Sequence, residues 1–150
     1  MTARVLAVLL VALASAASAA SVPADPKGRV AHHLREVEGL ARHFEGVLAG
    51  DCPPVTSAPQ WKEYVDGEVD RVVLLLAHLE QAWIEAKRTD DDDLRRTAKA
   101  PRQRADQARA LVDKLQDCAG SAGQSLAPLA LWRRIERELP KRQADIALPR

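Results

Sequence analysis

The most regular segment of the sequence covers residues 57–88 and reads SAPQWKEYVDGEVDRVVLLLAHLEQAWIEAKR. Its apolar residues recur alternately four and three positions apart, which is the spacing of one face of an amphipathic α-helix. They are Val65, Val69, Val72, Leu76, Leu79, Trp83 and Ala86. The segment opens with the form of a capping box, in which Ser57 serves one free backbone amide and Gln60 reaches back to another. We therefore predict a helix from this capping box to about Arg88.

A similar apolar stripe precedes this segment. Asp25 and Pro26 form a typical helix start, an N-cap followed by proline at the first helical position. The stripe behind them continues until Gly50 and the sequence Cys52-Pro53-Pro54. We expect this helix to span about residues 26–49.

Two further stripes follow the central segment. The first lies behind the acidic run 90–93 and contains Pro101, which predicts either a kink or a helix start at that point. The acidic run fits a helix N-terminus, where the macrodipole favours carboxylates, and it lacks the spacing of a calcium loop. A last helix is expected to begin near Ser125, with Pro140 stopping or bending it.

These stripes predict an all-α fold, an antiparallel up-down bundle of three to four helices. The sequence has two cysteines, Cys52 in the first connection and Cys118 at the start of the third. In an up-down-up-down bundle these two connections lie at the same end, so the cysteines are placed to form one disulfide. In the chain-entropy model, a bond across this separation stabilises the fold by about 4 kcal/mol.

The first residues have the order of a secretory signal peptide. Arg4 precedes an apolar run, and small residues follow, so we predict a leader over 1–19 with cleavage near Ala19 or Ala20. The run is about half of the roughly 20 residues that cross a bilayer, and no transmembrane segment is expected in the mature chain. The expected mature domain covers 20–150 and is periplasmic or secreted. Its 21 basic and 21 acidic residues balance, which gives no indication of nucleic acid binding.

No motif indicates an enzyme or a cofactor. A Gly-x-Ser-x-Gly elbow and a glycine-rich phosphate loop are both missing from the sequence, and the two cysteines are expected to be joined. The Glu-x-x-His pairs of a dimetal bundle and the Cys-x-x-Cys-His motif of covalent haem are missing too. We therefore expect a non-enzymatic protein without a cofactor.

The four histidines are the obvious metal ligands. Heptad positions place His33 half-buried and the others, His32, His43 and His78, further outward. If the first two helices form a hairpin, His78 comes level with residues 28–33, so that it can pair with His33 or His32, with Glu36 one turn away. The sequence thus allows a metal-binding or metal-sensing site at His33 and His78 as the alternative function.

The leading hypothesis is a protein-binding or structural module, in which a protein partner or a second copy packs on the outer faces of the first two helices. Gly39 and Gly46 lie at outward heptad positions of the first helix, and Gly67 and Leu74 at outward positions of the second. Small residues let another backbone approach closely, and Leu74 belongs to an apolar run that makes the second helix apolar almost all round. A basic cluster near Arg102 is interpreted as a solvated face, or alternatively as a surface for anionic lipids or polymers.

Overall fold

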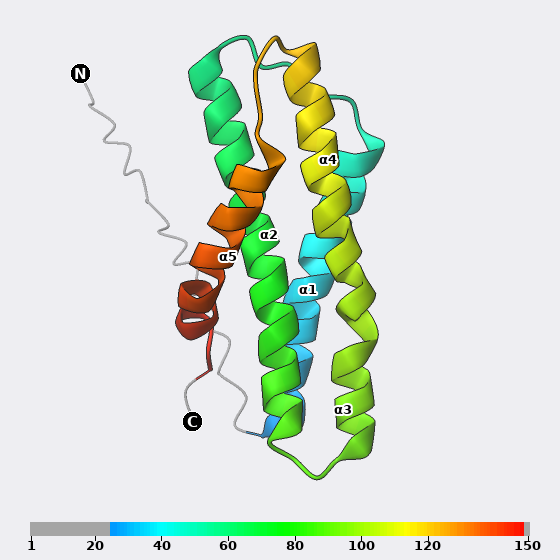
Figure 1. Ribbon diagram of the computed structural model, residues 1–150. Coiled ribbons are helices and arrows are strands. Elements are labelled where there is room, and N and C mark those ends of the chain that lie inside the picture. Colours follow the sequence, from blue (N-terminus) through cyan, green and yellow to red (C-terminus); the bar gives the residue numbers. More distant parts are fainter. Residues whose placement is uncertain (1–24, 149–150) are drawn as a thin grey trace, which may run out of the picture.

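The computed structural model describes residues 25–148, so the predicted leader over 1–19 and its cleavage site lie outside the described residues. Within the described part the regular structure is entirely helical, which confirms the all-α prediction. Its elements are α1 Pro26–Ala49, α2 Ala58–Lys87, α3 Asp92–Lys99, the 3₁₀ helix η1 Ala100–Arg104, α4 Ala105–Ser121 and α5 Pro128–Asp145 (Figure 1). None of these helices is both long and apolar enough to cross a membrane.

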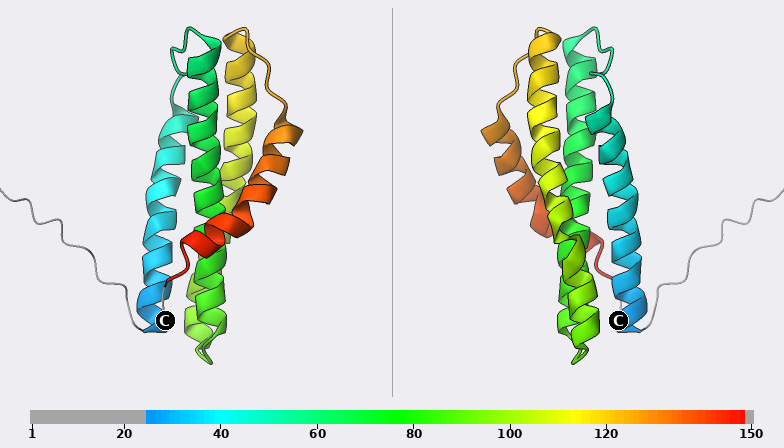
Figure 2. Two further views of the ribbon diagram at one scale, coloured as in Figure 1. Left: turned by 90° about the vertical axis from the view of Figure 1, so that its left-hand side faces the viewer. Right: turned by 90° about the vertical axis from the view of Figure 1, so that its right-hand side faces the viewer.

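The helices α1 and α2 and the rod formed by α3, η1 and α4 run up, down and up along one another (Figure 1). The last helix, α5, crosses the outside of α2 at an oblique angle in both side views (Figure 2). The first and third connections lie at the same end of the bundle, as the topology predicts. The bundle therefore has three aligned rods and one tilted helix, and α2 lies at its centre.

The helix starts are set by side-chain caps close to the predicted positions. Asp25 accepts a hydrogen bond from the Gly28 amide at 2.8 Å, and Asp91 accepts one from the Leu94 amide at 2.9 Å. Ser57 accepts from the Gln60 amide at 3.4 Å. The Gln60 side chain reaches back one residue further than a capping box requires, to the amide of Thr56.

Pro101 interrupts the third rod without starting it. A helix already begins at Asp92, and the chain tightens into η1 around Pro101 before continuing as α4. Proline lacks the amide hydrogen that an α-helix needs, and its ring crowds the preceding turn, which favours a short 3₁₀ segment there. Of the two predicted alternatives, an interruption within the helical rod is therefore the one that occurs, because a helix already precedes Pro101.

The last helix begins later than the sequence predicts and continues past Pro140. Pro128 takes the first helical turn, where a missing amide hydrogen costs nothing, so α5 starts three residues beyond Ser125. Pro140 lies inside α5 and does not end it. Both Pro140 and Glu136, whose carbonyl loses its helical donor, are exposed, so water can satisfy that carbonyl.

The buried apolar residues fall into two clusters. The large cluster contains Phe44, Trp61 and Leu115 and joins α1, α2, α4 and Ile135 of α5. The small cluster lies near the start of α1 and consists of Val30, Ala82, Ala86, Leu94 and Ala98. Because α2 contacts α1, α3, α4 and α5, its continuous apolar run from Val72 to Leu76 is packed on several sides.

Candidate functional site

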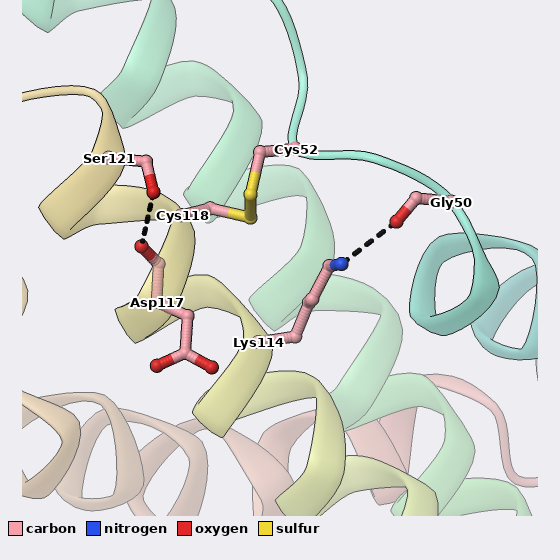
Figure 3. The surroundings of a disulfide bond; sticks show 6 residues. All are labelled: Gly50, Cys52, Lys114, Asp117, Cys118 and Ser121. Carbon is pink, nitrogen blue, oxygen red and sulfur yellow. Dashed lines mark hydrogen bonds between the residues drawn. A yellow bond between two sulfur atoms is a disulfide. The ribbon is translucent and has the colours of Figure 1, made fainter.

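A disulfide joins the two cysteines at one end of the bundle. The Cys52 and Cys118 sulfurs are 2.07 Å apart, and the two Cα atoms are separated by 5.4 Å (Figure 3). Beside the bond, the Lys114 Nζ donates a hydrogen bond to the Gly50 carbonyl at 2.8 Å. The disulfide therefore ties the connection after α1 to the last turns of α4, and the predicted pairing is confirmed.

A buried histidine pair lies between α1 and α2. The Nδ1 atoms of His33 and His78 are 2.9 Å apart, so one ring donates a hydrogen bond to the other. The predicted hairpin does bring residue 78 level with residue 33. Both rings are more buried than their heptad positions indicate, since His33 is fully buried and His78 is only 7% exposed. The expectation that His78 lies outward is wrong because α1 packs against a side of α2 that the apolar stripe does not include.

A buried ion pair lies beside the histidines. The Arg29 Nε donates to a Glu85 carboxylate oxygen at 3.1 Å, and both side chains are about 6% exposed. Arg29 also donates to the Leu148 carbonyl at 2.6 Å, which ties the segment after α5 to the start of α1. The other Glu85 oxygen accepts from Arg88 at 2.7 Å. The charges of this pair are therefore compensated where they are buried.

Burial lowers the pKa of both paired histidines from 6.5 to about 4, because removal from water penalises the charged imidazolium. Repulsion from His78 and His32 lowers the pKa of His33 further. Attraction to Glu36 opposes the shift of His78. Both rings are consequently neutral at pH 7, and the Nε2 atom of His33 is buried without a hydrogen-bond partner.

The histidines form a pair but not a ready set of metal ligands. The His32 ring lies beside them, with its centroid 6.3 Å from that of His78. Within residues 25–148, however, no three histidine, cysteine, aspartate or glutamate side chains are grouped to hold one ion. The metal-binding alternative stays a prediction, and native mass spectrometry of the exported protein tests it.

The residues predicted to bind a partner lie on the outside of α1 and α2. Gly39 and Gly46 are exposed, and a Cβ atom added at either would meet nothing within 4 Å. A Cβ atom added at Gly67 would lie 3.4 Å from the Arg71 guanidinium, and Leu74 is half-buried. The partner-binding role of these four residues stays a prediction. They do not form an exposed apolar patch, since Leu129 of α5 is the only large apolar side chain within the described chain that is strongly exposed.

An apolar groove opens beside α2 where α5 crosses it, and we name it the α2–η1 groove. Its volume is about 600 Å³. It is lined by Leu76, Leu79, Glu80, Ile84, Arg102, Ala105, Leu139 and Gln143. The Arg102 guanidinium spans its edge, 3.4 Å from a Glu80 oxygen and 5.1 Å above the Trp83 ring. Five of the eight lining residues are therefore apolar, and Glu80 and Arg102 supply one charge of each sign.

Neither the ion pair nor the groove was predicted. Arg29 and His33 are four residues apart on α1, and His78 and Glu85 are seven apart on α2, so helical spacing alone places each couple on one face. With His78 level with His33, this spacing would have indicated that Arg29 and Glu85 also lie near each other. The groove depends on the tilt of α5, which the sequence pattern does not specify.

No family model, curated protein or solved structure matches this chain.

Proposed function

We propose that the protein is an exported, non-enzymatic helical bundle that binds a partner protein in the α2–η1 groove. The observation that carries this proposal is the groove itself, which is lined mainly by apolar residues of α2 and is closed on its other sides by η1, the start of α4 and α5. Export is supported by the sequence of the leader and by a disulfide, which is compatible with an oxidising compartment.

The dimensions of the groove suit a short helix. Its apolar floor runs from Leu76 to Ile84 on α2, a distance of about 12 Å or two helical turns at 1.5 Å per residue. Amphipathic helices commonly bind in this way, with their apolar face in the groove and their polar edges at the rim. The chain already contains one such arrangement, because α5 packs on α2 and its Arg134 reaches Asp66 and Asp70 beside the contact.

The charges at the rim favour an acidic partner. Arg102 and Lys87 both lie over the Trp83 ring, with the Lys87 Nζ 5.5 Å from its centroid. Glu80 is the single carboxylate among the lining residues, and Arg102 already contacts it. A helix with carboxylates along one edge would therefore meet Arg102 in the groove lining and Lys87 outside it, on the Trp83 ring that both cations contact. We infer that the partner offers an acidic amphipathic helix, since opposite charges favour association and select its orientation.

A photo-crosslinking amino acid at position 84, expressed in the native host, tests the site. We expect it to capture one partner through an acidic helical segment, whereas the same amino acid at Leu129, exposed on α5, should not. The captured segment is then made as a peptide and its affinity measured. Capture of a second copy of this chain, or equal capture from both positions, would contradict the proposal.

Charge reversal then tests the rim. Arg102→Glu is expected to weaken binding of the captured peptide at least tenfold, because it replaces an attraction with a repulsion. Arg96→Glu is the matched control, since Arg96 belongs to the same basic stretch, is exposed and does not line the groove. Equal losses in both variants would indicate a general attraction between charges and would contradict a specific groove.

The N-terminus of the protein recovered outside the cytoplasm tests export. We expect intact mass and N-terminal sequencing to give a chain that begins at Ala20 or Ser21 with both cysteines oxidised. A chain that retains Met1 and two free thiols would contradict the assignment.

A further inference from the structure

The contact between His33 and His78 depends on protonation. Two Nδ1 atoms 2.9 Å apart can share one hydrogen, so one of the two nitrogens must keep its lone pair. When both rings are protonated, both Nδ1 atoms carry hydrogens and both rings carry positive charge. The contact is then repulsive in electrostatic and in steric terms.

The surroundings compensate two imidazolium charges only in part. The charged groups that act on the pair are Arg29, His32 and Glu36 of α1 and Glu85 of α2. Glu85 is already engaged by Arg29 and Arg88, and Glu36 is exposed to solvent. His32 adds a third imidazole beside the pair, with its ring centroid 5.3 Å from that of His33.

Besides the histidine pair, the start of α1 is held by the Arg29–Glu85 ion pair, by the Arg29 hydrogen bond to Leu148 and by a small apolar cluster. The small apolar cluster at this end contains a valine, a leucine and three alanines, which bury much less surface than the large cluster. At the other end the disulfide fixes the connection after α1 to α4. A force that separates α1 from α2 therefore acts on the weaker end.

We propose that the His33–His78 pair is an acid-sensitive latch, which keeps the first half of α1 on α2 when neutral and releases it when both rings are protonated. The released segment covers about residues 26–36 and ends before Val37 of the large cluster. The second half of α1 stays in place, because Phe44 lies in the large cluster and the disulfide follows at Cys52.

The direction of the pH effect follows from the pKa values. Each histidine has a pKa of about 4 in the closed form and of 6.5 when it is free in water. The open form therefore binds more protons between these values, and the closed form loses stability as the pH falls from 6.5 towards 4. With two protons taken up, the opening equilibrium constant rises by up to about 100-fold per pH unit in this range.

Tryptophan fluorescence reports the two ends separately. The chain has three tryptophans, of which Trp83 packs against the small cluster and Trp61 lies in the large one. Two full-length, disulfide-bonded variants each keep one of these residues and carry phenylalanine at the other two positions. As the pH falls from 7 to 4, we expect a reversible red shift of the Trp83 emission while the Trp61 emission stays constant. A simultaneous change of both would show global unfolding and would overturn the proposal.

Substitution of the pair identifies the groups that titrate. His33→Leu with His78→Leu, made in the Trp83 variant, should remove the transition above pH 4, because it replaces both polar partners with apolar groups. His43→Gln is the matched control, which removes a histidine bonded to Glu68 at 2.9 Å and should leave the transition unchanged. In the unmodified chain, ring ¹⁵N NMR should show both paired rings protonating as the segment opens. A transition that persists without the pair, or rings that titrate near 6.5 in a closed bundle, would overturn the latch.

Discussion

The two ends of the bundle are held by different interactions. At one end a disulfide and a core with Phe44, Trp61 and Leu115 fix α1, α2 and α4 together. At the other end a small, alanine-rich cluster is accompanied by a buried ion pair and a histidine pair. The first set of interactions is insensitive to protons, and the second depends on charge. Opening free energies usually differ along a protein, and here we expect them to be high at the disulfide end and low at the histidine end.

Among the changes that test this difference between the two ends, loss of the disulfide has the largest expected effect on the free energy of unfolding. Cys52→Ser with Cys118→Ser should lower the free energy of unfolding by about 4 kcal/mol, because the unfolded chain regains the entropy of a long loop. Urea unfolding at pH 7 measures the change, and reduction of the unmodified protein should reproduce it. A loss below about 1 kcal/mol would indicate that packing alone holds this end.

Truncation of one leucine in each cluster compares the two cores. Leu115 is 1% exposed and surrounded by large side chains, whereas Leu94 is 8% exposed and packs among alanines. We expect Leu115→Ala to cost about 3–4 kcal/mol and Leu94→Ala about 2 kcal/mol, since a cavity costs more where many neighbours lose contacts. Urea unfolding of the two variants gives both values. A larger loss for Leu94 would reverse the proposed order of the ends.

Removal of the buried arginine tests the polar part of the histidine end. Arg29→Met leaves Glu85 with Arg88 as a remaining partner and frees the Leu148 carbonyl, so we expect a loss of about 2 kcal/mol by thermal unfolding. Arg42→Met is the control, because Arg42 forms an exposed pair with Glu38 at 3.6 Å and should change stability by less than about 0.5 kcal/mol. Equal effects would mean that the buried pair contributes no more than a surface pair.

Substitutions on the outer face of α1, which runs from one end of the bundle to the other, have the smallest expected effect on stability. Gly39→Ala and Gly46→Ala should each stabilise the protein by about 0.5–1 kcal/mol, because alanine favours the helix and the added methyl group meets no neighbour. Thermal unfolding measures the gain. A loss of stability would contradict the open space at these positions. A gain accompanied by weaker partner binding would favour this face over the α2–η1 groove.

The fold was predictable where local chemistry decides it. Asp25 and Pro26 specify the start of α1, and the positions of Cys52 and Cys118 agree with one end of an up-down bundle. The tilt of α5 was not predictable, because an apolar stripe indicates which face of a helix packs but does not specify its crossing angle.

The histidine site was predictable only in part. The hairpin placed His78 level with His33, and the structure brings the two rings into contact. The burial of His78 was missed because a heptad analysis assigns one buried face to a helix, whereas α2 is packed on several sides. The ion pair of Arg29 and Glu85 was missed for the same reason, since it lies between two helices outside either apolar stripe.

Hydrogen exchange of individual backbone amides at pH 7 and pH 5 compares the two ends most directly. The native, disulfide-bonded protein is used, and the rates are corrected for the intrinsic effect of pH on exchange. We predict that acid lowers the opening free energy of residues 30–36 of α1 and leaves that of residues 41–49 and of α4 unchanged. An equal decrease at both ends, or no decrease at residues 30–36, would contradict the claim that a proton-sensitive end and a covalently fixed end coexist in this bundle.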